Sequence, residues 1–199
     1  MFTNRLVAIA AATLFSSAVF AALTLPNPFQ APSQKVKQHE MVTQGAGEWE
    51  GTITMHLPGA PEPVVTACTE SVQAIGDYWT VSDFQSNFEG QAFQGSSTMG
   101  YDVEKKKFVA TWVDSMSTSF TQMEGTYDAN KKVIVMDYEA KDPATGEAKD
   151  ARMTLQHNGD SYTSSFYDVT EDGENLTMVI EMHRKKVVEA NSDKSAEKQ

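Results

Sequence analysis

Three aspartates lie within or at the end of apolar, strand-like runs, where a carboxylate can be held for general acid and base catalysis. They are Asp83, Asp114 and Asp137. Asp114 is the candidate of most interest because it follows Trp112 and Val113 at the end of such a run. An aspartate at a strand end commonly caps the following turn, so the pattern favours a structural role over a catalytic one.

Nucleophilic chemistry has less support. Ser96 and Ser97 lie in a strand-like segment between two glycines, whereas a Gly-x-Ser-x-Gly nucleophile needs a strand-to-helix turn. Cys68 is the one cysteine of the chain, so no internal disulfide can form. Its immediate neighbours offer no cation to lower the pKa of the thiol, and we interpret Cys68 as a buried strand residue.

The histidines do not predict a metal site. They are scattered at His39, His56, His157 and His183, without the close spacing of zinc-binding motifs. Two of them follow a methionine directly, but adjacent residues of a strand point to opposite faces and cannot readily chelate one ion. We therefore predict no metal and no cofactor; a haem held by one histidine is geometrically possible but has no support in the sequence.

Large apolar side chains could instead line a cavity for a small apolar molecule, since methionine and aromatic residues adapt well to such ligands. The predicted ligand-binding residues, all expected in the interior of the fold, are Trp79, Phe93, Trp112, Phe120, Met136, Phe166 and Met178. Further methionines of the same set are Met99, Met116, Met123, Met153 and Met182. The same side chains could also fill a solid core, and the sequence leaves both alternatives open.

These residues lie on a series of strand-like runs. After Gly47 the apolar period becomes two, with Trp49, Ile53 and Met55 alternating with polar residues, as expected for a strand with one buried face. In the last run Met178, Ile180 and Met182 share one face. The other runs lie at about 64–72, 78–84, 91–101, 108–115, 119–127, 133–140, 151–157 and 161–169.

Short connections rich in turn residues make sequential strands antiparallel neighbours. A weak repeat, Gly100-Tyr101-Asp102 and Gly125-Thr126-Tyr127-Asp128, is followed each time by paired lysines and an apolar strand, which predicts two similar hairpins with an aspartate capping each turn. So many strands must close or split to avoid exposed edges. We predict an all-β, antiparallel up-and-down barrel of about ten strands with a short N-terminal helix near 35–43; a sandwich is the alternative.

The two ends of the chain have other roles. Arg5 precedes an apolar run at 6–20 that closes on Ala21, which predicts a signal peptide at 1–21 and a periplasmic or secreted product without a membrane anchor after cleavage. A proline-rich linker at 22–34, the barrel domain at 35–187 and a disordered polar tail at 188–199 complete the predicted organisation. The formal net charge of −11 argues against nucleic acid as a partner.

The arrangement of Gly47 and Trp49 in the first strand, with Arg184 at the end of the last, resembles the calycins, the lipocalin-like barrels. In that superfamily a Gly-x-Trp tryptophan packs at the closed end of the barrel beneath an arginine from near the carboxyl end. The resemblance implies that Trp49 and Arg184 form a barrel-closing pair, in which a guanidinium lies over an indole face.

A closer resemblance, over about residues 39–186, is to family 1579 of the domains of unknown function. It is carried by a combination of motifs: His39, Gly47-Glu48-Trp49-Glu50-Gly51, Gly100-Tyr101-Asp102, the run at 108–115, Asp142-Pro143 with Gly146, Asp172-Gly173 and Arg184-Lys185. The resemblance implies the fold but no activity. The chain departs from the pattern at Met182-His183, where an aromatic residue is expected before Arg184.

Three functions follow from these patterns. The first is an exported bacterial, non-enzymatic barrel that carries or senses a small apolar molecule. The second is a periplasmic hydrolase or isomerase that uses the strand-end carboxylate of Asp114 with a nearby tyrosine or histidine. The third is a solid-core interaction module of the cell envelope, whose partners would be proteins.

Overall fold

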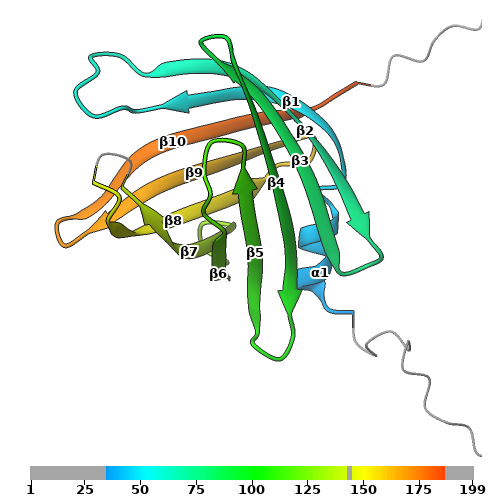
Figure 1. Cartoon of the computed structure of the whole chain (residues 1–199). Helices are drawn as coiled ribbons and strands as arrows, with labels where there is room; N and C mark the ends of the chain where they lie inside the picture. Colours follow the sequence, from blue (N-terminus) through cyan, green and yellow to red (C-terminus); the bar gives the residue numbers. More distant parts are fainter. Residues whose placement is uncertain (1–34, 143–144, 187–199) are drawn as a thin grey trace, which may run out of the picture. The chain divides into compact units, whose positions relative to one another are not determined.

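The computed structural model describes residues 35–142 and 145–186. The predicted signal peptide at 1–21, linker at 22–34 and tail at 188–199 lie outside the described residues. Helix α1 (Lys37–Thr43) precedes the strands (Figure 1). These are β1 (Gly47–Met55), β2 (Val64–Ile75), β3 (Trp79–Phe88), β4 (Gln91–Asp102), β5 (Lys107–Asp114), β6 (Thr121–Asp128), β7 (Val133–Lys141), β8 (Ala148–His157), β9 (Ser161–Thr170) and β10 (Gly173–Arg184).

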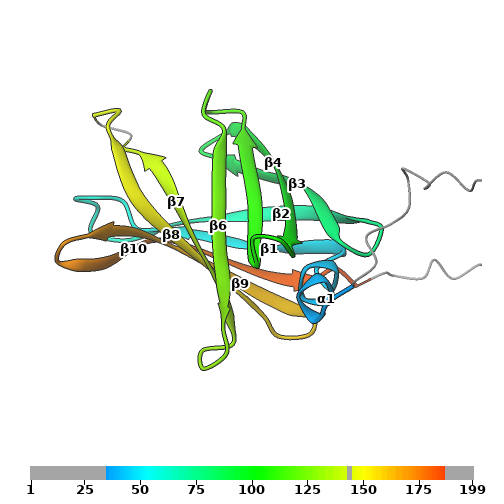
Figure 2. The same cartoon turned by 90° about the horizontal axis from the view of Figure 1, so that it is seen from below.

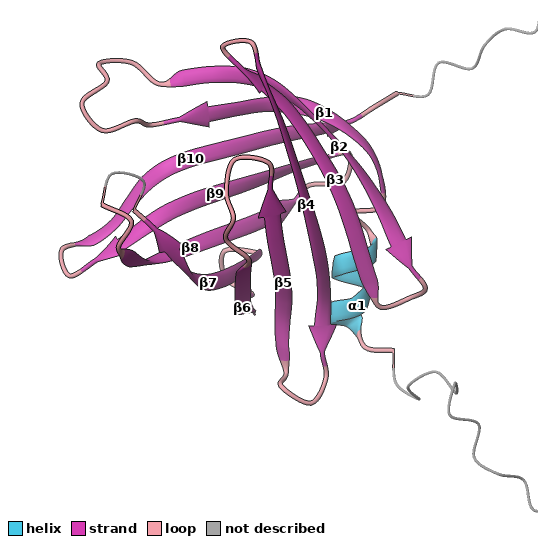
Figure 3. Cartoon of the chain, in the orientation of Figure 1, coloured by secondary structure: helices cyan, strands magenta, loops and turns pink. Residues whose placement is uncertain are grey.

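The strands form one closed antiparallel barrel in the order β1-β10-β9-β8-β7-β6-β5-β4-β3-β2. Every strand pairs with its neighbours in sequence, and β1 pairs with β10 to close the sheet. Figure 3 shows the strands wrapping around a common interior, with one short helix beside them in the described part of the chain. The prediction of an up-and-down barrel is confirmed, and the sandwich alternative is wrong.

In β1 the alternation of apolar and polar residues in the sequence matches the alternation of buried and exposed side chains in the structure. Trp49 and Ile53 are buried, whereas Glu48 and Glu50 are exposed. Across the closing seam Trp49 is the register partner of Arg184, and Ile53 is the partner of Ile180. This register joins the first strand to the last along one inner face, so the barrel closes with its apolar side inward.

The two repeated motifs form equivalent hairpins. In the β4–β5 turn, Asp102 Oδ1 accepts hydrogen bonds from the backbone N–H groups of Glu104 and Lys105 at 2.9 and 3.0 Å. In the β6–β7 turn, Asp128 Oδ1 accepts from the residues two and three positions later at 2.8 and 3.1 Å. The predicted aspartate caps are confirmed.

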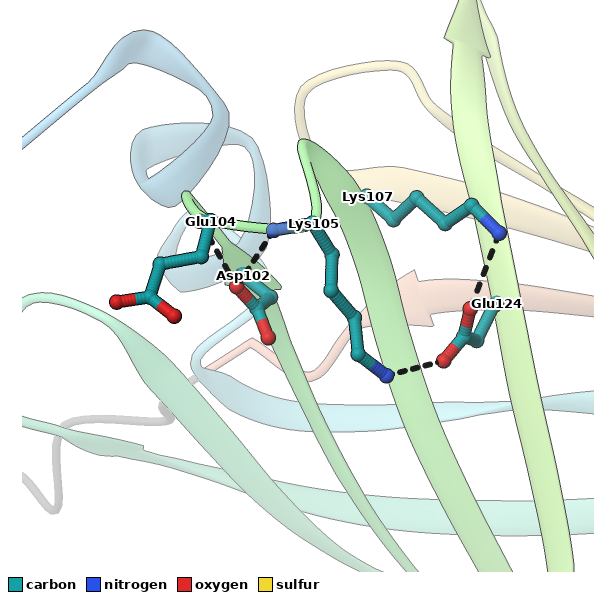
Figure 4. Close-up of polar contacts among 5 residues, drawn as sticks. All are labelled: Asp102, Glu104, Lys105, Lys107 and Glu124. Carbon is teal, nitrogen blue, oxygen red and sulfur yellow. Dashed lines mark hydrogen bonds and ion pairs between the residues drawn. The ribbon is translucent and has the colours of Figure 1, made fainter.

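The side chains of the first hairpin also reach the next strand (Figure 4). Lys105 and Lys107 both contact the carboxylate of Glu124 on β6, the latter at 3.0 Å. All three side chains are exposed. Because surface ion pairs of this kind are worth about 0–1 kcal/mol, they fix the outer face of the hairpin without dominating its stability.

Helix α1 lies at one end of the barrel beside β3 and β4 (Figures 1 and 2). The buried ring of His39 holds it there. His39 Nδ1 accepts from the backbone N–H of Val36 at 3.1 Å, so Nε2 carries the proton and donates to the carbonyl oxygen of Tyr101, also at 3.1 Å. The ring of His39 also makes edge contacts with the rings of Tyr78 and Tyr101.

The interior contains two clusters of buried apolar residues. One is centred on Phe108, Ile134 and Met136 from β5 and β7. The other is centred on Trp49, Ile53 and Met182 along the seam of β1 and β10. Trp112 and Leu155 pack against both clusters, so they connect the two sides of the barrel interior.

Candidate ligand cavity and the closed end of the barrel

The barrel interior is not completely filled. A cavity of about 870 Å³ is lined by residues from all ten strands. Most of the lining is apolar: Ile53, Met55, Val72, Phe84, Phe88, Phe93, Met99, Trp112, Met123, Met136, Met153, Leu155, Phe166, Met178 and Ile180. Pockets that bind drug-sized molecules typically measure about 300–1,000 Å³, so the cavity has the size of a ligand site.

Most of the residues predicted to bind a ligand meet in this cavity. Phe93, Trp112, Met136, Phe166 and Met178 all line it. The rings of Phe93 and Trp112 stack with their centroids 6.4 Å apart, and Phe84 contacts both edge-on. The aromatic residues therefore form one continuous wall.

Trp79 and Phe120 were predicted to face the interior, and the structure places them elsewhere. Trp79 begins β3, in which Thr80, Ser82 and Phe84 take the buried positions. Its ring lies over Gly100 on the outer face of the barrel. A Cβ added to Gly100 would be 2.1 Å from a ring carbon of Trp79. Phe120 precedes β6 and is 61% exposed. The aromatic character of a residue therefore did not suffice to predict an interior position. Whether a side chain points inward depends on where the strand begins and on the alternation along it.

The methionines differ in their distance from the cavity. Met99, Met123 and Met153 line it together with the exposed Met116. Met182 has no exposed surface and does not belong to the lining, because it packs beneath it with Cys68 and Trp49. The interior is thus part solid core and part cavity.

Trp49 and Arg184 close the end of the barrel beneath α1. The guanidinium carbon of Arg184 lies 4.3 Å from the centroid of the Trp49 ring. Arg184 Nη1 and Nη2 donate to the carbonyl oxygens of Ala46 and Gln44 at 2.7 and 3.1 Å, and Trp49 Nε1 donates to that of Gly45 at 2.8 Å. The carbonyl groups that follow the helix are therefore satisfied by the pair.

Gly47 makes this arrangement possible. Its φ is 140°, a backbone conformation that side chains disfavour. A Cβ at this position would also lie 2.2 Å from Nη1 of Arg184. The glycine of the Gly-x-Trp motif thus leaves room for the arginine that covers the tryptophan.

A group of polar side chains interrupts the apolar lining. Glu70 of β2, Ser82 of β3, Ser97 of β4 and Tyr162 of β9 all line the cavity. The hydroxyl of Tyr162 donates to Glu70 Oε2, and Ser82 also hydrogen-bonds the Glu70 carboxyl group. The hydroxyl oxygens of Ser82 and Ser97 lie 2.9 Å apart. We call these four residues the polar cluster.

Burial changes the acid-base properties of the polar cluster. It raises the pKa of Glu70, and the hydrogen bonds from Ser82 and Tyr162 oppose this shift only in part. Burial and the neighbouring Glu70 also raise the pKa of Tyr162. Glu70 was not predicted as a site residue from the sequence. The alternation of side chains along a strand nevertheless places it on the same inward face as Cys68, two residues earlier.

Cys68 is buried in β2, as predicted. Burial and the nearby Glu70 raise the pKa of the thiol to about 12. Its Sγ lies 3.4 Å from Sδ of Met182. The thiol is therefore protonated at neutral pH and behaves as an apolar core group.

The three candidate aspartates do not come together. Asp83 and Asp137 point outward and are exposed, and Asp137 pairs with Arg152 at 2.6 Å. Asp114 lines the cavity, but Oδ2 accepts from Trp112 Nε1 at 3.0 Å and Oδ1 accepts from the backbone N–H of Met116 at 2.9 Å. The expected turn cap is confirmed at Asp114.

The histidines are also separate. His39 lies on α1 and is buried, whereas His56 and His183 are exposed. His157 lines the cavity, and burial together with the charge of Arg184 lowers its pKa to about 4. Within residues 35–142 and 145–186, no group of three or more histidine, cysteine, aspartate or glutamate residues could hold a metal ion.

A family model described as "Protein of unknown function (DUF1579)" matches residues 34–186. Among solved structures, the chain is similar to the crystal structure of Rv2717c from M. tuberculosis, with a TM-score of 0.58 and 13% sequence identity over 77% of this chain and 100% of that one. At this identity the likeness concerns the fold alone. No curated protein matches the chain. None of the helices in the described ranges is long and apolar enough to cross a membrane.

Proposed function

The chain belongs to the DUF1579 family of proteins of unknown function, and from this premise we propose that it is an exported, non-enzymatic barrel that binds a small apolar ligand. The observation that carries the proposal is the cavity of about 870 Å³ inside the barrel, with its largely apolar lining. An apolar molecule that enters such a cavity leaves water for methionine and aromatic surfaces, which is favourable by roughly 25 cal/mol for each Å² of apolar surface removed from water.

The lining suits ligands of variable shape. Met99, Met123 and Met153 contribute flexible thioether side chains, which adapt to different apolar partners. Phe93 and Trp112 form a stacked and more rigid aromatic wall. This combination supports binding of a class of apolar molecules rather than one closely fitted ligand.

The contacts of Asp114 support binding over catalysis. Both carboxylate oxygens accept hydrogen bonds that hold Trp112 and the following turn. These contacts give Asp114 a structural role in the cavity wall, as expected for a carboxylate that caps a turn at a strand end. The alternative of a hydrolase or isomerase predicts that Asp114→Asn abolishes turnover, whereas a carrier should keep most of its ligand affinity. The hollow interior, in turn, gives less support to a solid interaction module.

We also infer export to the periplasm or the medium, on the basis of Arg5, the apolar run at 6–20 and the cleavage position after Ala21. N-terminal sequencing of the protein from a periplasmic fraction should find Ala22 as the first residue. An intact Met1, or the absence of the protein from both the periplasmic fraction and the medium, would contradict export by cleavage.

The direct test of ligand binding is native mass spectrometry of the mature protein purified from its own cells, compared with its denatured mass. A small-molecule adduct that disappears on denaturation is expected. Titration with the neutral apolar dye N-phenylnaphthylamine should give saturable binding. A bare chain that also fails to bind the dye would contradict the proposal.

Two matched substitutions on β9 locate the binding. Ser164 is buried, lines the cavity and pairs with Leu155 and Ile180, so Ser164→Phe places a ring in the cavity. Ser165 is adjacent and faces outward, which makes Ser165→Phe the control. We expect Ser164→Phe to weaken dye binding at least about tenfold and Ser165→Phe to leave it unchanged, with circular dichroism showing both folded.

A further inference from the structure

Glu70 differs from the other carboxylates of the barrel in its surroundings. It is mostly buried, faces the cavity and makes hydrogen bonds to two neutral groups, the hydroxyls of Tyr162 and Ser82. No ion pair to Glu70 is formed within the described part of the chain. By contrast, outward-facing carboxylates such as Glu124 and Asp137 each contact a lysine or an arginine.

The direction of the hydrogen bonds can be followed through the polar cluster. An ionised carboxylate only accepts, so Ser82 donates to Glu70. The hydroxyl proton of Ser82 is then used, and Ser97 donates to Ser82 across their 2.9 Å contact. In this ionised form Ser82 and Tyr162 both donate to the carboxylate of Glu70, which has acceptor capacity left for a further donor.

The rest of the lining contains no balancing cation. No lysine or arginine is found among the described residues that line the cavity, and the other lining carboxylates, Glu89 and Asp114, add negative charge. His157 also lines it, but its pKa is lowered to about 4, so it is neutral at pH 7. A buried charge without a counter-charge is costly, and a positively charged ligand group would remove much of that cost.

We propose that the cavity takes an apolar molecule that ends in a protonated amine, with the ammonium group bound by the carboxylate of Glu70. This inference rests on the proposed ligand-binding function and names its ligand class. The apolar part of the ligand packs against the methionine and aromatic lining, and the amine donates to Glu70. A fatty carboxylate is disfavoured, because the described lining of the cavity includes the carboxyl groups of Glu70, Glu89 and Asp114 but no lysine or arginine to pair with its anionic group.

The experiment varies only the head group of the ligand. Decylamine, decanol and decanoate compete with N-phenylnaphthylamine for the wild-type protein at pH 7. We expect decylamine to bind at least about tenfold more tightly than decanoate, with decanol between them. Equal or tighter binding of decanoate would overturn the inference while leaving the apolar cavity function intact. Failure of all three ligands and of the dye would overturn both.

Two matched substitutions test the role of the carboxylate. Glu70→Gln should remove the preference for decylamine while leaving decanol affinity within about twofold. Glu48→Gln is the control, because Glu48 is an exposed carboxylate on the outer face of the neighbouring β1 and also accepts a serine hydroxyl, that of Ser71 at 2.7 Å. An amine preference that survives in Glu70→Gln, or is lost equally in Glu48→Gln, would overturn the assignment to Glu70. Should Glu70→Gln fail to fold, the head-group series on the wild-type protein decides the question.

Discussion

The closed end of the barrel and the wall of its cavity place the same kind of side chain in different surroundings. At the closed end Trp49 is 1% exposed, is covered by Arg184 and donates its N–H to the carbonyl oxygen of Gly45. In the cavity wall Trp112 is only partly buried, and its N–H is held by Asp114. Both indole N–H groups are satisfied, but one ring is enclosed by protein and the other borders the cavity.

The comparison separates residues that hold the barrel together from residues that define what it can bind. At the closed end the polar groups satisfy one another, as the contacts of Arg184 to the carbonyl groups after α1 show. In the cavity the carboxylate of Glu70 keeps unused acceptor capacity and lacks a counter-charge. A bound ligand can therefore supply the hydrogen-bond donor and the counter-charge that the protein does not provide to Glu70.

The largest expected difference between the two ends is in the cost of truncating each tryptophan. Trp49→Ala should lower the free energy of unfolding by about 3–5 kcal/mol, because it removes a fully enclosed ring and leaves a cavity. Trp112→Ala should cost about 1–2 kcal/mol, since the ring already borders a cavity, and should weaken dye binding. Urea unfolding of both variants measures the difference. Equal losses of stability would show that Trp112 is a core residue like Trp49.

The second expected effect is a dependence of stability on pH that originates at the closed end. The pKa of His157 is lowered to about 4 in the folded protein, from an unfolded value of 6.5, by burial and by the charge of Arg184. The folded state therefore disfavours the protonated ring. Above pH 6.5 His157 makes its full contribution to the free energy of unfolding. As the pH falls toward 4, up to about 3 kcal/mol of that free energy is lost.

His157→Gln isolates this contribution from that of the cavity carboxylate. Burial raises the pKa of Glu70, so protonation of Glu70 favours the folded state as the pH falls and opposes the effect of His157. Chemical unfolding at a series of pH values between 7 and 4 should show a larger loss of stability in the wild type than in His157→Gln. Parallel curves for the two proteins would contradict the assignment to His157.

The pair at the closed end was expected from the resemblance of the sequence to the calycins, which implied that an arginine near the carboxyl end covers the tryptophan of a Gly-x-Trp motif. Arg184 lies far along the chain from Gly47 and Trp49, but the barrel topology that follows from short turns brings the first and last strands together. The strand period predicted the alternation in β1, and the aspartate caps followed from local turn chemistry.

The cavity was only partly predictable. Residue type identified Phe93 and Trp112 as lining residues but also Trp79 and Phe120, which lie outside the cavity. Whether the interior is hollow depends on the volumes of side chains from all ten strands at once, and no local pattern reports that sum. Glu70 was predictable in principle from its position in an alternating strand, because a carboxylate at an inward position is uncommon.

The smallest expected effect compares an arginine at the closed end with one on the outer face. Arg184→Lys keeps the charge but cannot reproduce the planar contact with Trp49 and the two hydrogen bonds to Ala46 and Gln44, so it should cost about 1–2 kcal/mol. Arg152→Lys on the outer face, where the arginine contacts the exposed Asp137 and Glu174, should cost less than about 1 kcal/mol. Urea unfolding measures both losses of stability. High salt should reduce the loss caused by Arg152→Lys more than the loss caused by Arg184→Lys, because screening acts on exposed charges. If Arg152→Lys proved the more damaging substitution, the outer ion pairs rather than the closed end would hold the last strands in place.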